Sequence, residues 1–94
     1  MTWIKVIPLS EANEPLLSAL QNQRALYPAE YAKPVHPVEG GETSSIVASH
    51  SLIPDALFHA FATFGSLMSA DLPLSRRQHE MIETMVSVTN RCFY

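Results

Sequence analysis

The sequence predicts an all-α protein of about four helices, on the basis of its periodicity, its capping residues and its lack of paired strands. Apolar residues recur at intervals of three and four in several segments, which is the spacing of one helix face. Only residues 3–9 alternate as a strand would, and no second segment is suited to pair with them. With 94 residues, of which 47% are hydrophobic, we expect a single helical domain, residues 1–94.

The first elements are expected to be an extended arm and a helix. Residues 3–9 are expected to extend along the helices or a neighbouring subunit, because a proline near their end cannot donate a strand hydrogen bond. Ser10 suits an N-cap, and Pro15 moves the regular part of the helix to a start near Asn13. Pro28 ends the element, whose apolar residues share one face: Leu16, Leu17, Leu20 and Tyr27.

A long connection is expected next. Residues 28–43 hold three prolines and two glycines, which favours an extended chain with polyproline character. Such a connection either wraps over the helices or faces a partner, and Tyr31 and Val35 are its candidate anchors. His36 is not expected to bind a metal ion, because no second ligand lies at a usable spacing. A short helix is expected within residues 43–48.

The next helix carries the main apolar stripe. Pro54 suits the first turn, and Asp55 suits the positive end of the helix dipole. Gly65 within the stripe would permit close approach of another helix. The spacing is that of one helix face, so these residues are expected to form core and not a cofactor site: Leu57, Phe58, Phe61, Phe64, Gly65 and Met68.

The last helix has the clearest start. Ser75 is followed by Gln78, which is the capping-box spacing, and Arg76 and Arg77 then fall in the first turn. Glu80 lies on the polar side of this helix. The opposite face is expected to be buried, and it comprises Met81, Ile82, Met85, Val88 and Thr89.

The composition excludes several classes of function. A net charge of -3 with one adjacent basic pair argues against a nucleic-acid partner. No apolar run approaches the ~20 residues of a membrane span, so no membrane association is expected. The single cysteine, Cys92, cannot form a disulfide within the chain, which fits a cytoplasmic protein. No metal-ligand cluster or glycine-rich phosphate loop occurs in the sequence, so neither a metal ion nor a cofactor is expected.

Residue type alone leaves the chemistry open. Cys92 could be a nucleophile or a small buried hydrophobe, and no histidine lies at short spacing from it. Glu80, on a polar helix face, could simply be solvated.

The spacing of the last helix resembles the AhpD-like alkylhydroperoxidases of the carboxymuconolactone decarboxylase superfamily, and especially their peroxidase-related branch. In that branch a helix runs into a Cys-x-x-Cys motif and then a histidine. The segment from His50 to Phe64 is also similar, so the resemblance covers about the last fifty residues well and the first forty loosely. The residues that fall into register are Leu74, Ser75, Arg76, Arg77, Gln78, His79, Glu80, Met81, Ile82, Val86, Ser87, Asn90 and Cys92.

The resemblance implies a homo-oligomeric antioxidant enzyme that reduces hydroperoxides with a thiol reductant. Glu80 matches the proton-relay acid of the family, and Cys92 matches the resolving cysteine. The peroxide-attacking residue would occupy position 95, after Tyr94, so we expect the helical domain to be incomplete and this chain to be inactive. One hypothesis is that position 95 is a selenocysteine encoded by UGA; a frameshifted gene, a deliberate truncation and a genuinely short protein are the alternatives.

Two other functions stay open. The chain could be a non-enzymatic helical oligomerisation module, with the Met81/Met85 or Phe58/Phe61 stripe at the interface. A decarboxylase or lactone-handling activity is the weaker alternative, because that branch of the superfamily does not depend on the cysteine pair.

Overall fold

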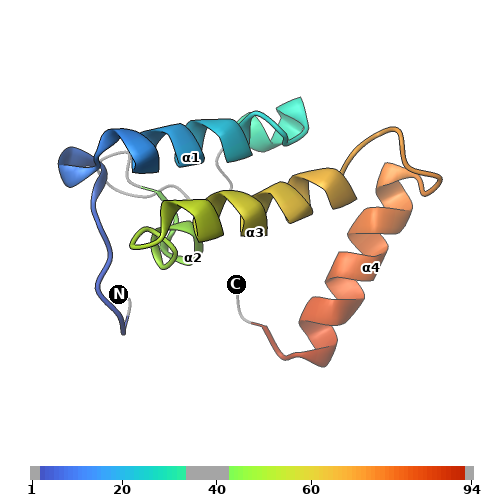
Figure 1. Cartoon of the computed structure of the whole chain (residues 1–94). Coiled ribbons are helices and arrows are strands. Elements are labelled where there is room, and N and C mark those ends of the chain that lie inside the picture. Colours follow the sequence, from blue (N-terminus) through green and yellow to red (C-terminus); the bar gives the residue numbers. More distant parts are fainter. Residues whose placement is uncertain (1–2, 34–42, 93–94) are drawn as a thin grey trace.

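The computed structural model describes residues 3–33 and 43–92, which form α-helices and short 3-10 turns and no β-strand (Figure 1). This confirms the all-α prediction. In chain order the elements are η1 (Leu9–Glu11), α1 (Glu14–Arg24), η2 (Ala29–Ala32), α2 (Ser45–Ala48), α3 (Pro54–Leu67) and α4 (Arg76–Thr89).

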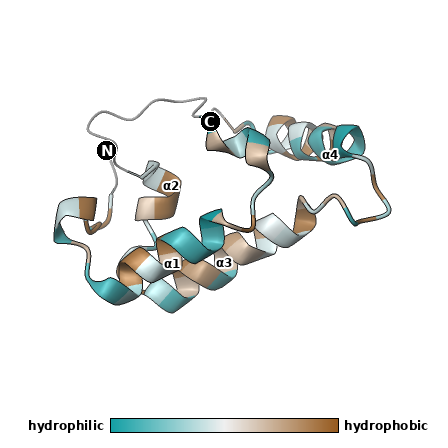
Figure 2. Cartoon of the chain, turned by 90° about the horizontal axis from the view of Figure 1, so that it is seen from above, coloured by the Kyte–Doolittle hydropathy of each residue, from teal (hydrophilic) through white to brown (hydrophobic). Residues whose placement is uncertain are grey.

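The core lies between α1 and α3, which run side by side in the same direction (Figures 1 and 2). Leu16 of α1 and Leu57 of α3 are 1% and 0% exposed, and Ala19 completes the centre. Full burial of a leucine side chain stabilises the fold by about 1.5–3 kcal/mol, so these few residues make a small core. Half-buried apolar side chains surround it: Ile7, Ala12, Leu20, Val47, Phe58 and Phe61.

Gly65 sets the distance between α3 and the turn that follows α1. A Cβ at this position would lie 2.7 Å from the Cβ of Leu26 and 3.3 Å from its carbonyl oxygen. The prediction that Gly65 permits a close approach is therefore confirmed. The neighbour is the turn after α1 and not the body of another helix.

The N-terminal arm makes a hydrogen bond to the turn that follows α2. The N–H of Ile7 donates a hydrogen bond of 2.8 Å to Oγ of Ser51, which is buried in the turn after α2. Trp3 is fully exposed, so it does not pack on the helices of its own chain. Ile7 also packs against the core, so this part of the arm lies along the helices.

The predicted cap of α1 is wrong. Asn13 is the N-cap, and its side-chain oxygen accepts the N–H of Leu16 at 3.1 Å. Ser10 lies in η1 instead. The reason is Pro15, which has no N–H to bond and is tolerated only in the first helical turn, so the helix begins just before it.

The connection after α1 also departs from the prediction. The helix ends at Arg24, so Tyr27 lies beyond it and not on its face. Residues 29–32 form a 3-10 turn and not an extended chain, because the N–H of Tyr31 bonds back to the carbonyl of Pro28 at 3.0 Å. Val35 and His36 lie outside the described residues.

The start of α4 confirms the capping-box prediction. Oγ of Ser75 accepts the N–H of Gln78 at 3.3 Å, and Oε1 of Gln78 accepts the N–H of Ser75 at 2.8 Å. These reciprocal bonds satisfy two of the N–H groups that a helix start leaves unpaired.

The predicted burial of the apolar face of α4 is wrong. The helix diverges from the α1–α3 pair (Figures 1 and 2), and only His79 within it is buried. Met85, at the centre of the expected buried face, is 66% exposed. Periodicity determines which residues share a face, but not which element covers that face. The exposed residues are Met81, Ile82, Met85, Val88 and Thr89.

Of the helices within the described ranges, none combines the length and the apolar content that a bilayer crossing requires.

Candidate functional site

Glu80, the predicted relay acid, belongs to a cluster that joins α4 to η2. The Tyr31 hydroxyl donates to Oε1 of Glu80 at 3.1 Å, and Nε of Arg76 donates to the same oxygen at 2.7 Å. The guanidinium carbon of Arg76 also lies 4.8 Å from the centroid of the Tyr31 ring, within cation–π range. We call these three residues the Glu80 cluster. It connects positions 49 residues apart in the sequence.

Local structure orients each member of the cluster. Arg76 and Glu80 are four residues apart on α4, so their side chains lie one turn apart on the same face. The ring of Tyr31 packs against two other aromatic rings. Its ring centroid lies 6.2 Å from that of Tyr27 and 5.9 Å from that of Phe64, and those two rings are themselves 5.3 Å apart. Aromatic packing therefore holds the hydroxyl that bonds to Glu80.

The hydrogen bonds of the cluster determine its charge state. The bond from Arg76, and after it the bond from Tyr31, lowers the pKa of Glu80 below its ordinary value. Burial, and then the bond to Glu80, raises the pKa of Tyr31. At neutral pH Glu80 is therefore an ionised acceptor and Tyr31 a protonated donor. Both bonds go to the same oxygen, Oε1, so together they fix the orientation of the carboxylate.

A second carboxylate lies next to the cluster. Glu83 is half-buried one turn further along α4, and burial followed by the charge of Glu80 raises its pKa. The environments of these neighbouring carboxyl groups thus push their pKa values in opposite directions. Such divergence is a feature of acid–base sites, although it also occurs in structural ion-pair networks.

Cys92, the predicted resolving cysteine, lies just beyond the other end of α4 and is exposed. Its N–H bonds to the carbonyl of Ser87 at 2.8 Å, and the N–H of Arg91 bonds to the carbonyl of Val88 at 3.0 Å. Together with the left-handed conformation of Arg91, at φ 52°, these bonds form a Schellman motif. The possibility that Cys92 is a small buried hydrophobe is therefore wrong.

The structure does not bring Glu80 and Cys92 together. Glu80 and Thr89 are nine positions apart on α4, which corresponds to about 13 Å of helix axis at 1.5 Å per residue. Cys92 lies beyond Thr89, after a turn. A proton could pass between the two side chains only through an intervening group.

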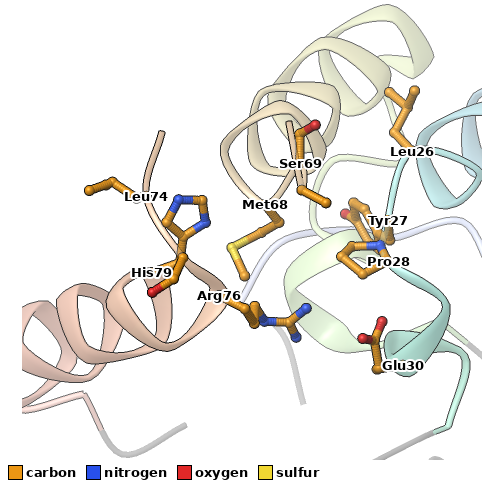
Figure 3. A pocket seen from close by; sticks show the side chains of 11 residues that line it. Leu26, Tyr27, Pro28, Glu30, Met68, Ser69, Leu74, Arg76 and His79 are labelled. Carbon is orange, nitrogen blue, oxygen red and sulfur yellow. The ribbon is translucent and has the colours of Figure 1, made fainter. Parts of the chain in front are cut away.

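A cleft of about 510 Å³ opens beside the Glu80 cluster (Figure 3). Arg76 and His79 of α4 form one wall, and they face the segment of Tyr27 and Glu30 across the cleft, with Met68 at the end of α3 between the walls (Figure 3). The remaining lining residues are mostly apolar or small: Leu26, Pro28, Ser69, Ala70, Leu74 and Ser75.

His79 is the buried polar residue of this cleft. Its side chain is 7% exposed, and Nδ1 is buried without a hydrogen-bond partner. Buried polar atoms are normally bonded, so an unbonded nitrogen at a cleft wall marks a place where another group can bind.

Sequence reasoning missed three of these residues as members of a site. Tyr31 was recognised only as a candidate anchor, and Arg76 was placed in a first helical turn and in the register of the family motif without a role of its own. The four-residue spacing of Arg76 and Glu80 could have indicated their ion pair. His79 follows Arg76 by three residues and thus shares its face, but nothing in the sequence indicates that this face would be enclosed.

Within residues 3–33 and 43–92, no three metal-binding side chains gather into a group that could hold a metal ion. Compared with known proteins, the chain matches no family model, no curated protein and no solved structure.

Proposed function

We propose that this chain is the N-terminal portion of an AhpD-like, peroxidase-related protein that reduces hydroperoxides with a thiol reductant. The observation that carries the proposal is the state of Glu80. At the position that resembles the family's relay acid, hydrogen bonds from Arg76 and Tyr31 hold one oxygen of the carboxylate and so fix its orientation. The Glu80 side chain is 48% exposed, and it is nevertheless bonded to a residue 49 positions away in the sequence.

The proposed reaction assigns Cys92 the second chemical step. A thiolate or selenolate at position 95 attacks the outer oxygen of a hydroperoxide, the O–O bond breaks, and the alcohol leaves after it receives a proton. The oxidised residue is then a sulfenic or selenenic acid. Cys92 attacks its sulfur or selenium, which forms a disulfide or selenosulfide and releases water. An external dithiol reduces this bond and restores both residues. The exposure of Cys92 suits exchange with such a reductant.

In this scheme Glu80 would transfer a proton from the attacking group to the leaving group. The carboxylate accepts the proton of the attacking group, and that proton then goes to the leaving alkoxide. Because Glu80 lies about 13 Å of helix axis before the end of α4, the relay requires the histidine that the family carries a few residues beyond its cysteine pair. The proposed reaction therefore requires position 95 and that histidine, both of which follow Tyr94 in the family pattern.

The test is hydroperoxide consumption with dithiothreitol as the reductant. The 94-residue chain is compared with a chain lengthened by the downstream coding sequence, with selenocysteine incorporated if UGA follows Tyr94. We expect turnover only in the longer chain and loss of turnover in Cys92→Ser. Glu80→Gln should lower the rate by about 10²-fold or more, which is the usual contribution of a general acid or base. The matched control is Glu83→Gln, which removes the neighbouring carboxylate and should change the rate little. Equal rates in the short and long chains, or in the two glutamate variants, would refute the proposal.

A second candidate function is supported by the exposed face of α4. Five large apolar residues on this one helix are more than half exposed: Met81, Ile82, Met85, Val86 and Val88. A contiguous apolar surface of this kind is typical of a protein–protein interface, and a second copy of the chain would cover it in a homo-oligomer. Sedimentation velocity tests this function. A dimer that dissociates in Met85→Glu, but not in the control Ile46→Glu at an exposed position of α2, would support it. A monomer at high concentration would refute it.

A further inference from the structure

The cleft between η2 and the start of α4 has the dimensions of a ligand site. Its volume of about 510 Å³ lies within the range of small-molecule pockets, about 300–1,000 Å³. Apolar and polar side chains line it in nearly equal number, so a ligand with both kinds of group could be accommodated. It lies at the N-terminal end of α4, whereas Cys92 lies beyond the C-terminal end (Figure 1).

The unbonded nitrogen of His79 indicates a polar ligand atom. Nδ1 is buried and has no partner, and the imidazole lies beside Leu74 and Met68 (Figure 3). A bound water needs two to four polar partners, and these apolar neighbours supply none. A ligand group that bonds Nδ1 would relieve the cost of leaving this nitrogen unpaired.

The two walls of the cleft carry opposite charges. Arg76 lies three residues before His79 on α4, so both can donate hydrogen bonds from one face of the helix. Glu80 binds only Nε of Arg76, and the end of the guanidinium points across the cleft toward Pro28 and Glu30 (Figure 3). Glu30 acts electrostatically on Arg76, yet no ion pair joins these two described residues. The cleft therefore has a cationic wall and an anionic wall, with space between them.

We propose that this cleft binds a zwitterionic α-amino acid with a large apolar side chain. The carboxylate accepts hydrogen bonds from Arg76 and from the Nδ1–H tautomer of His79, and the ammonium group faces Glu30. The side chain packs against Leu26 and Met68, which are apolar residues of the same lining. The end of the Arg76 guanidinium that Glu80 does not bind, together with the Glu30 carboxylate, favours this ligand over a simple carboxylate, since a simple carboxylate would leave Glu30 unpaired and repelled. The proposal does not depend on the thiol chemistry proposed for Cys92.

The test is a ligand titration of the 94-residue chain. Isothermal calorimetry measures the affinity, and amide chemical shifts in NMR spectra locate the bound ligand. Three matched probes are used: L-phenylalanine, 3-phenylpropanoate, which lacks the ammonium group, and phenethylamine, which lacks the carboxylate. We expect saturable binding of L-phenylalanine, with shifts at the residues of the cleft. Affinity for each truncated probe is expected to be at least tenfold weaker.

Two variants locate the site. Glu30→Gln removes an exposed carboxylate from a 3-10 turn and should weaken L-phenylalanine binding at least tenfold, while the control Glu11→Gln in η1 leaves it unchanged. His79→Leu should also weaken binding and, without ligand, raise the urea midpoint of unfolding, because it removes a buried unbonded nitrogen. Any one of four results would overturn the proposal. These are no saturable binding, equal binding of phenylpropanoate, no effect of Glu30→Gln, and shifts confined to the Met81–Val88 face of α4.

Discussion

The contact at Gly65 allows a quantitative prediction for Gly65→Ala. The new methyl group would lie 2.7 Å from the Cβ of Leu26, whereas two carbon atoms pack best at about 3.5–4.0 Å. The turn after α1 must therefore move by about 1 Å. Overpacking of this kind costs about 1–3 kcal/mol. Replacing a glycine within a helix by alanine contributes about 1 kcal/mol in the other direction. The free energy of unfolding is therefore expected to fall by about 1 kcal/mol.

Urea denaturation followed by circular dichroism measures this change. The matched control is Ser66→Ala, which alters an exposed neighbour on the same helix and should stabilise it by about 0.5 kcal/mol or less. A helical glycine without an obstructing neighbour would give the opposite result, a stabilisation by about 1 kcal/mol on replacement by alanine. That result for Gly65→Ala would refute the contact with Leu26. Because Leu26 also lines the cleft, Gly65→Ala should change the amide chemical shifts there too.

Four further predictions concern single residues and their contacts. Tyr31→Phe should raise the pKa of Glu80 toward its ordinary value in a ¹³C NMR titration, and an unchanged pKa would contradict the hydrogen bond. Since the folded-state pKa of Glu80 is lowered, its pairing stabilises the fold above the unfolded value of about 4.3, and that stabilisation is lost as the pH falls through the folded value. Glu80→Gln should therefore lose less stability than the parent chain between pH 7 and low pH, as measured by urea unfolding. Arg91→Gly should stabilise the C-terminal end of α4 by about 1 kcal/mol, because glycine adopts φ 52° without strain, and a loss of helicity in circular dichroism would contradict this. Ser51→Ala should cost about 1–3 kcal/mol, since it leaves the N–H of Ile7 without its acceptor; an unchanged urea midpoint would count against that bond.

The sequence was most informative where the cause of the structure is local. The capping box of Ser75 and the first turn at Pro54 depend on residues within one helical turn, and both are present. The stripe around Leu57 could be predicted from its helical spacing, and its burial is due to the packing of α1 against it. For α1, the predicted start near Asn13 is confirmed and the predicted Ser10 cap is wrong, because Pro15 is tolerated only in the first turn and Asn13 lies directly before that turn.

The candidate site depends on contacts between segments, and these could not be predicted from spacing. Tyr31 meets Glu80 because a 3-10 turn and an aromatic cluster place it there, not because of any pattern in α4. The exposure of Met85 follows from the direction in which the connection before α4 leaves α3. Such a direction depends on the whole chain, and no residue near Met85 encodes it.

The divergence of α4 from the α1–α3 pair gives the helix the mechanics of a lever. Its first turns carry the Glu80 cluster and the cleft wall, while residues 84–92 are exposed along their whole length. The fourteen residues of α4 span about 21 Å, so a rotation of 10° about the attached end would displace the far end by about 4 Å. A small change in the packing of Tyr31 or His79 would therefore produce a larger displacement of Cys92. The position of the thiol thus depends on side-chain packing at the opposite end of the helix.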